Sequence, residues 1–431
     1  MTKSLEEVYR SVHIPRKLPP LRKLLAFLGP GFLISVGYMD PGNWATDIAG
    51  GSQFGYQLLF VVLLSNLMAM VLQHLSLKLG VATGKDLAQV CHDQYGKRLR
   101  FALWILAEVA ITACDLAEVI GSAIALELLF GLPIMVGVLI TSLDVFILLL
   151  LQKRGQRALE FVIVGLVAII FGSFLMEIIW SHPSIAAILH GALPSKEIAT
   201  NPGMLYLAIG ILGATVMPHN LYLHSALVQT RKFGTSIKDK VTAIRYATLD
   251  SNIALVAASG VNAAILIVSA AAFHTNGLHQ VAEIQDAHQL LAPILGNTWA
   301  PVVFAAALLA SGHSSTITGT LAGQVVMEGF IDLHIAPWKR RLITRAAAII
   351  PAVIVIWLYG EGALAQLLVF SQVVLSLQLP FAVVPLILFT SNRKIMDQFA
   401  NSRTLVVLAS VIGIVIIALN ALLIGQVIGI G

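Results

Sequence analysis

The residues best suited to chemistry lie where long apolar runs are interrupted. Asp40-Pro41-Gly42-Asn43 stands in the middle of an apolar run from about residue 24 to residue 51. Pro41 removes a backbone donor and pushes Asp40 out of helical geometry, and a lone acid in a bilayer costs several kcal/mol unless it is paired. The stretch predicts a broken helix whose carbonyls, carboxylate and amide converge on a cation. The alternative is a proline-kinked helix with a buried, hydrogen-bonded Asp40.

A second stretch supports the broken-helix interpretation. Residues 214–220 interrupt an apolar run from about residue 204 to residue 229, and they contain Met217, Pro218 and His219. Both interruptions carry Met, Pro and Asn in the same order. Paired interrupted helices in two halves of a chain are typical of a transporter site built on inverted repeats.

The side chains at the two interruptions suggest which cation they would hold. The Asp40 carboxylate, the Asn43 amide oxygen and unwound carbonyls near Gly37 and Ala214 would suit sodium, magnesium or calcium. Met217 adds a soft thioether, which favours later transition metals over calcium and magnesium. A divalent site for manganese or iron follows, with cadmium and cobalt as mimics. The alternative for Met217 is ordinary core packing.

Acids on the third apolar segment form a second candidate feature. Glu108, Asp115 and Glu118 lie on one helix face and span roughly 15 Å. Such a ladder predicts a proton relay, and His219 is a candidate link because histidine titrates nearest neutral pH. His224 and Asp144 are weaker candidates. The alternative is structural pairing with arginines at the start of the ninth segment, namely Arg340, Arg341 and Arg345.

Composition places these features in a membrane. Of 431 residues, 58% are hydrophobic and 11% charged, and the mean hydropathy is +0.87, which indicates an all-α polytopic membrane protein. The two cysteines predict no disulfide framework, and residues 1–23 lack the apolar core of a signal peptide. Eleven apolar segments are predicted, at residues 24–52, 56–77, 101–130, 133–151, 158–180, 203–230, 248–273, 299–323, 342–359, 363–389 and 404–428.

The basic residues sort between the two sides of such a bundle. With eleven spans, 26 of the 27 Lys and Arg residues fall on the side of the N-terminus, and Lys196 alone falls on the other. The positive-inside rule therefore predicts a cytoplasmic N-terminal segment (1–23) and an extracellular C-terminus. The expected transmembrane domain covers 24–428, with repeats at about 24–180 and 203–389 and an extra helix at about 404–428. The outer loop 274–297 is acidic and histidine-bearing, so it could concentrate cations or simply be a soluble loop.

The two motifs also carry a family resemblance. Asp40-Pro41-Gly42-Asn43 together with Met217-Pro218-His219 resembles the Nramp family of proton-coupled divalent metal transporters over essentially all eleven segments. The resemblance implies a LeuT-like fold of two inverted five-helix repeats plus one helix, with helices 1 and 6 broken. It implies side-chain ligation by Asp40, Asn43 and Met217, and backbone ligation by Gly37 and Ala214. It also implies that Gln372 joins the metal site in some states; the alternative for this residue is a helix–helix hydrogen bond.

The expected function is import of manganese and iron with protons, by alternating access, through a bacterial cell membrane. The metal is substrate, so no resident cofactor is expected, and neither nucleic acid nor an obligate protein partner is predicted beside the metal ions, the protons and the lipid bilayer. The main alternative is a sodium-coupled amino-acid transporter of the same fold, which would not need Asp40 or Met217. A channel would need a filter or a ring of like residues, and a metallohydrolase would need a motif such as His-Glu-x-x-His; the sequence contains neither.

Overall fold

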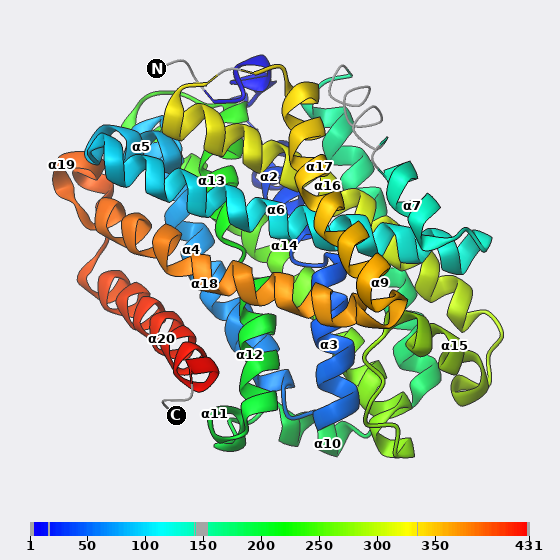
Figure 1. Ribbon diagram of the computed structural model, residues 1–431. Coiled ribbons are helices and arrows are strands. Elements are labelled where there is room, and N and C mark those ends of the chain that lie inside the picture. Colours follow the sequence, from blue (N-terminus) through cyan, green and yellow to red (C-terminus); the bar gives the residue numbers. More distant parts are fainter. Residues whose placement is uncertain (1–3, 16–17, 142, 144–153, 334, 429–431) are drawn as a thin grey trace.

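The chain folds into a bundle of helices that cross the molecule between two ends (Figure 1). The structure is a computed structural model and describes residues 4–15, 18–141, 143, 154–333 and 335–428. The described N-terminal residues lie at one end of the bundle, and the short helices α10 (Ile185–Gly191) and α11 (Glu197–Thr200) lie at the opposite end.

The first half of the chain forms helices separated by short turns. They are η1 (Glu6–Val8), α1 (Pro20–Phe27), α2 (Pro30–Gly37), α3 (Pro41–Phe54), α4 (Leu59–Thr83), α5 (Leu87–Gln94), α6 (Lys97–Phe130), α7 (Ile134–Thr141) and α9 (Gln156–Ser181), after a short strand, β1 (Val12–His13).

The second half continues in the same way. Its elements are α10 (Ile185–Gly191), α11 (Glu197–Thr200), α12 (Pro202–Thr215), α13 (Pro218–Leu227), η2 (Val228–Thr230), β2 (Arg231–Lys232), α14 (Ile237–Ala272), η3 (His274–Asn276), α15 (Ile284–Leu295), α16 (Ala300–Ile331), α17 (Pro337–Tyr359), η4 (Glu361–Ala363), α18 (Leu364–Ser391), α19 (Arg393–Met396), η5 (Asp397–Phe399) and α20 (Arg403–Ile428).

Both predicted helix breaks are present. α2 ends at Gly37 and α3 begins at Pro41, with Asp40 as the N-cap residue of α3. α12 ends at Thr215 and α13 begins at Pro218. In each case the proline stands at the first helical position, where its missing N–H is not needed. The prolines therefore start a second half-helix rather than merely kink one long helix.

The count of eleven spans is not confirmed. Within the described residues, eight helices are long and apolar enough to cross a membrane, and a shorter apolar helix covers Leu342–Leu358. α2 and α3 are each too short alone because of the break, and the predicted fourth span runs on into 144–153, outside the described residues. The predicted boundaries also shift, since the first span begins at Pro30 rather than residue 24 and α14 begins before residue 248.

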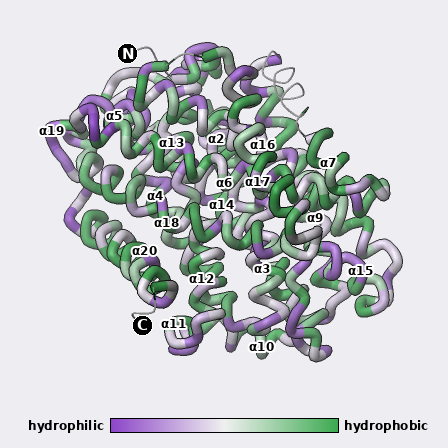
Figure 2. The backbone as a smooth tube through the Cα atoms, viewed as in Figure 1, coloured by the Kyte–Doolittle hydropathy of each residue, from purple (hydrophilic) through white to green (hydrophobic). Residues whose placement is uncertain are grey.

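Apolar residues cover the flanks of the bundle (Figure 2). On α20 the side chains of Val407, Val411 and Ile414 are exposed, as expected for a surface that faces lipid. Inside, the fully buried Trp44 of α3 packs edge-on against Phe174 of α9 and Phe304 of α16. These contacts hold α3, with its N-terminal Asp40, in the centre of the bundle.

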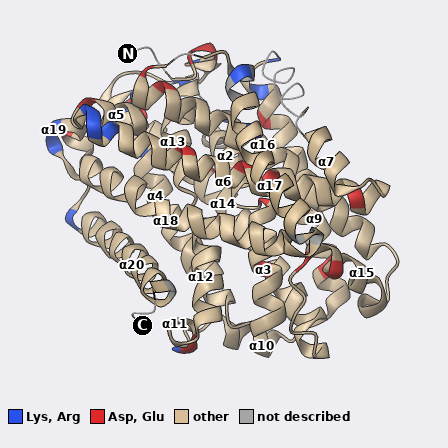
Figure 3. Ribbon diagram, viewed as in Figure 1, with Lys and Arg blue, Asp and Glu red and all other residues tan. Residues whose placement is uncertain are grey.

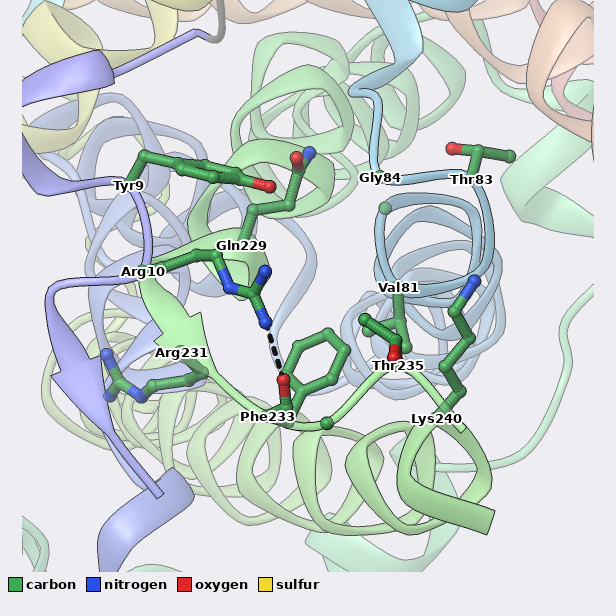
Figure 4. A pocket seen from close by; sticks show the side chains of 12 residues that line it. Tyr9, Arg10, Val81, Thr83, Gly84, Gln229, Arg231, Phe233, Thr235 and Lys240 are labelled. Atoms are coloured by element: carbon green, nitrogen blue, oxygen red, sulfur yellow. Dashed lines mark hydrogen bonds between the residues drawn. The ribbon is translucent and has the colours of Figure 1, made fainter. Parts of the chain in front are cut away.

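Residues 4–15, here named the N-terminal strap, run across one end of the bundle. β1 pairs in parallel with β2, directly after α13 and η2. The Ser4 hydroxyl donates to Asp86 at 2.6 Å, and the Leu5 N–H donates to Glu328 at 3.2 Å. A cavity of about 170 Å³ lies beside the strap. Figure 4 shows the side chains that line it, among them Arg10, which donates to the Phe233 carbonyl. The strap therefore ties the end of α13 to α16 and to the turn before α5.

Candidate metal site

Asp40 lies fully buried at the gap between α2 and α3. One carboxylate oxygen, Oδ1, accepts from the Asn43 backbone N–H at 2.8 Å and from the Asn43 side-chain amide at 2.7 Å. The first bond is an N-cap, which satisfies a donor that the helix start leaves unpaired. The break thus presents a carboxylate at the N-terminal end of a half-helix, in the centre of the protein.

Asn43 joins the two breaks. Its amide nitrogen also donates to the Ala214 carbonyl, at 3.2 Å, in the last turn of α12. Its amide oxygen accepts from Asn262 of α14 at 3.1 Å. The amide NH₂ group, which carries partial positive charge, therefore lies between Asp40 and Ala214, two oxygens that the sequence predicted as metal ligands. A cation between them would meet the Asn43 oxygen only after the amide turned over.

Met217 and Gly37 meet at the same place. The buried Met217 thioether accepts a hydrogen bond from the Asn220 amide at 3.6 Å. A Cβ at position 37 would approach the Met217 sulfur to 3.2 Å and would collide with the Asn220 amide. The Gly37 carbonyl accepts from the Asp40 N–H at 3.3 Å. Glycine therefore lets the end of α2 approach the start of α13.

Gln372 of α18 reaches the start of α3. A side chain at Gly42 would collide with the Gln372 amide, so the two residues are in close contact. The Gln372 amide nitrogen donates to the neighbouring Ser371 hydroxyl at 2.9 Å. The structure thus brings Gln372 against the Asp40-Pro41-Gly42-Asn43 stretch.

The acids of α6 lie beside an arginine from α17. Arg345 lies 3.8 Å from Glu118, and it donates to the Asp115 carbonyl at 3.3 Å and to the Thr316 hydroxyl at 2.9 Å. All these groups are buried. α16 approaches closely at Gly319, where a Cβ would come within 3.0 Å of the Glu118 carboxylate. Of the arginines predicted to pair with these acids, Arg345 does so, while the side chains of Arg340 and Arg341 lie outside the described part of the structure.

The other candidates have different hydrogen-bond surroundings. Glu108 accepts from the Trp104 indole one turn earlier on α6, at 3.1 Å. His219 is buried beside the second break, and neither of its ring nitrogens has a hydrogen-bond partner among the described residues. His224 bonds to the Gln73 amide at 2.8 Å, and Asp144 lies outside the described residues.

Three neighbours of the site were missed by the sequence analysis. Asn262 donates to the Tyr38 carbonyl and to Asn43, and the Ser311 hydroxyl donates to the Met39 carbonyl. Cys114 of α6 lies near both Asp40 and Glu118. A polar residue in the middle of an apolar segment is the only signal that marks Asn262 and Ser311, and Cys114 directly precedes Asp115 on the acidic face.

The donor set differs from that of a resident metal centre. Within the described ranges, no group of three or more His, Cys, Asp or Glu side chains could hold a metal ion. The two breaks instead combine one carboxylate, one amide, one thioether and backbone carbonyls. Few charged ligands favour binding that is weak enough for release.

Comparison with known proteins identifies the family. The model of the Nramp family, described as natural resistance-associated macrophage protein-like, matches residues 31–426. The chain belongs to the Nramp family. It is 58% identical over 423 residues to a divalent metal cation transporter, MntH, of a Nostoc species, covering 98% of this chain and 96% of the relative. A Listeria monocytogenes protein of the same name is 55% identical over 417 residues, covering 97% and 93% of the two chains.

Solved structures agree with this membership in the Nramp family. A manganese transporter of Eremococcus coleocola matches with a TM-score of 0.90 and 41% identity, covering all of this chain and 96% of that one. Mhp1, a nucleobase-cation symporter, matches with a TM-score of 0.60 at 15% identity, over 92% of this chain and 91% of that one, which shows a shared fold alone. The LeuT-like fold is therefore confirmed, and the chain is a membrane transporter rather than an enzyme.

Proposed function

We propose that this Nramp protein imports divalent transition metal ions, Mn²⁺ and also Fe²⁺, together with protons. The observation that carries the proposal is the meeting of Asp40, Asn43, the Ala214 carbonyl and Met217 at two helix breaks. The Asn43 NH₂ group donates to the Asp40 carboxylate and to the Ala214 carbonyl. These two oxygens, which attract the partial positive charge of the NH₂ group, would also attract a cation. The names of the relatives, which are those of metal and manganese transporters, support the same substrate class.

In this proposal Asp40 and Asn43 supply hard oxygens, and Met217 supplies a soft thioether. Gly37 and Ala214 contribute carbonyls freed by the helix breaks, and Gln372, which contacts the start of α3, joins the site in some states. Calcium and magnesium prefer oxygen ligands only, so the sulfur favours transition metals. A sodium-coupled amino-acid transporter would have no use for an acid at this break, which disfavours that alternative.

Proton coupling would use the acids of α6. A dication that binds the Asp40 carboxylate displaces a proton from it, because metal ligands must be deprotonated. The onward acids on α6 are Glu118 and Asp115, and Arg345 contacts both residues. We expect protons to leave along this face toward the end where the N-terminus lies, past Glu108, and His219 to assist beside the break. Arg340 and Arg341 would complete the path.

Alternating access would come from movement around the breaks. Unwound segments at 38–40 and 216–217 are natural hinges, because few backbone bonds oppose bending there. The N-terminal strap bonds to the residues directly after α13, through Arg10 N–H to the Gln229 carbonyl and Ile14 N–H to the Lys232 carbonyl. Opening the N-terminal side of the site would require these bonds to break or the strap to move with α13.

The test of the proposed function is metal uptake by the purified protein in proteoliposomes. An imposed pH gradient, acidic outside, should drive accumulation of Mn²⁺ and Fe²⁺ and acidify the lumen. Ca²⁺ and Mg²⁺ should compete poorly, and an imposed sodium gradient should have no effect. Mn²⁺ uptake that ignores the pH gradient would contradict proton coupling, and the absence of Mn²⁺ uptake would contradict the substrate assignment.

A further inference from the structure

Cys114 occupies a position between the two functional clusters. It lies on α6 directly before Asp115, and its side chain is 1% exposed. Its sulfur lies 4.0 Å from Asp40 Oδ2 and 3.6 Å from Glu118 Oε1. No disulfide involves this residue, since both cysteines are free. The thiol thus stands between the carboxylate of the metal site and the nearest acid of the proton path.

The two oxygens of Asp40 have different surroundings. Both bonds from Asn43 go to Oδ1, whereas Oδ2 faces the Cys114 sulfur. When an oxygen and a sulfur bind the same metal ion, the oxygen lies about 3–4 Å from the sulfur. This follows because metal–oxygen and metal–sulfur bonds are about 2.1 and 2.3 Å long. The separations of Cys114 from Asp40 and Glu118 match this range, so an ion on Oδ2 would have the thiol within reach.

The sulfur of Met217 lies in the same buried cluster as Cys114. Cys114, Met217 and Leu375 form one small buried cluster that is separate from the main core. The Met217 thioether is therefore not the one soft atom near Asp40. Sulfur ligands select ions such as Cd²⁺ and Zn²⁺ over Ca²⁺ and Mg²⁺, and two of them select more strongly than one.

We propose that Cys114 is a second sulfur donor of the metal site and determines how strongly the protein prefers soft ions. This inference rests on the proposed function and extends it to a residue that lies outside the two helix breaks. When sulfur binds the ion, the S–H bond breaks and Glu118 Oε1, 3.6 Å away, is placed to take the proton. The same atom thus links the arrival of a soft ion to the acid that begins the proton path.

A buried cysteine is more commonly a small packing residue, and two substitutions separate the two roles. Cys114→Ser keeps the size and a hydrogen-bond donor but removes the sulfur. Cys114→Ala removes both, and it serves if the serine variant fails to fold. Cys91, the other buried cysteine, lies on α5 in the main core, so Cys91→Ser is the matched control.

The decisive measurement is X-ray absorption spectroscopy of the full-length protein loaded with Cd²⁺. The wild type and Cys91→Ser should show two sulfur neighbours per ion, and Cys114→Ser and Met217→Ala should each show one. A single sulfur in the wild type that persists in Cys114→Ser and disappears in Met217→Ala would overturn this inference and leave the metal site standing. A wild type that binds no Cd²⁺ and carries no Mn²⁺ would overturn the proposed function itself.

Transport gives an independent readout. In proteoliposomes, Cys114→Ser should weaken inhibition of Mn²⁺ uptake by Cd²⁺ by at least about tenfold, since losing even a group that only supports a metal ligand costs about 10–100-fold in affinity. Uptake of Mn²⁺ alone should change much less, because its preference for sulfur is weaker. If Cys114→Ser weakened Mn²⁺ uptake and Cd²⁺ inhibition equally, and left the number of sulfur neighbours per Cd²⁺ as in the wild type, the residue would have only a packing role.

Discussion

At the scale of single residues, the proposed metal site depends on one acid. Asp40 is the only carboxylate within either helix break, and its bonds to Asn43 hold it at the start of α3. The other donors at the two helix breaks are neutral, so the attraction of the breaks for a dication should rest largely on this side chain. Its removal should therefore have a larger effect than removal of any neutral ligand.

Replacement of Asp40 by Ala should abolish both Mn²⁺ binding and uptake, with an affinity loss of more than about a hundredfold. Isothermal titration of the purified variant with Mn²⁺ measures the binding. Glu177→Gln is a suitable control, since Glu177 is a buried acid of α9 and is not among the proposed ligands. Near-wild-type affinity in the Asp40 variant would move the site elsewhere.

Replacement of Met217 by Ala should change selectivity more than capacity. Mn²⁺ affinity should fall by less than about tenfold, Cd²⁺ should lose more, and Ca²⁺ and Mg²⁺ should compete relatively better because they gain nothing from sulfur. Competition of Ca²⁺ against Mn²⁺ uptake in the wild type and the variant tests this. A purely structural Met217 would instead leave a cavity and lower stability or uptake of all ions alike.

At the scale of elements, α6 contacts both the proposed metal site and the proposed proton path. Residues around Cys114 meet the helix breaks, while Glu118 and Asp115 meet Arg345 of α17 and α16 approaches at Gly319. A long helix that contacts both the metal site and the arginine can carry a proton between them without moving. Changes to these acids should therefore act on coupling rather than on metal affinity.

Glu118→Gln should weaken Mn²⁺-driven proton entry more than Mn²⁺ binding, because it removes the charge and keeps the size of the side chain. A pH-sensitive dye inside proteoliposomes reports the proton flux, and titration reports the binding. Asp115→Asn should behave in the same direction. Proportional losses of binding and proton flux would argue that Glu118 only supports the structure around Arg345.

A hydrogen bond between the segment before α15 and the start of α18 should respond to pH. It lies at the end of the molecule opposite the N-terminus. Glu283, before α15, accepts a hydrogen bond from Ala365 at the start of α18 at 3.0 Å. Burial raises the pKa of Glu283 from 4.5 to about 7, and nearby Asp286 adds to the rise. The protonated side chain is therefore favoured by the fold, and its contribution to stability is complete below pH 4.5 and is lost as the pH rises through 7.

Glu283→Gln should consequently remove part of the pH dependence of stability. Relative to the variant, the wild type should lose thermal stability as the pH rises from 4.5 to 7, by a small amount since the side chain is only about half buried. Thermal unfolding in detergent across this range measures the difference. Glu197→Gln on α11, an exposed acid, is the control, and parallel pH curves for the wild type and Glu283→Gln would contradict the expectation.

At the scale of the whole molecule, charge is distributed unevenly between the two ends. Figure 3 shows Lys and Arg gathered at the end that carries the N-terminus, with a basic residue also beside α11 at the other end. Lys196, the basic residue that the sequence assigned to the opposite side, directly precedes α11. The flanks between the ends are apolar. This distribution supports a cytoplasmic N-terminus under the positive-inside rule.

Labelling of introduced cysteines tests the orientation. Lys196→Cys should react with a membrane-impermeant maleimide in intact cells, whereas Lys238→Cys at the start of α14 should react only after permeabilisation. Both positions are exposed, and the two native cysteines are buried, so background labelling should be low. The reverse pattern would invert the proposed topology and with it the direction of transport.

The sequence alone predicted the helix breaks, the candidate site residues beside them and the difference in charge between the two ends. The prolines at 41 and 218 predicted both breaks because proline is tolerated at the start of a helix but not inside one. Asp40 stood out because an acid is costly in lipid, and Met217 stood out because its soft thioether directly precedes the helix-breaking Pro218. Their roles as metal ligands stay predictions. Charge counting also separated the two ends. Each of these predictions uses only neighbouring residues in the chain or the cost of placing a polar or charged residue in a lipid bilayer.

The tertiary structure decided which distant groups meet. That Arg345 is the arginine beside Glu118, that Asn262 contacts Asn43, and that Cys114 lies between Asp40 and Glu118 follow from the packing of α6, α14 and α17 around the breaks. Periodicity places a residue on a helix face but leaves the rotation and neighbours of that helix open. The rotation and neighbours depend on packing between helices that are far apart in sequence. Trp44 packs against Phe174, for example, and Gly319 lets α16 approach Glu118 closely.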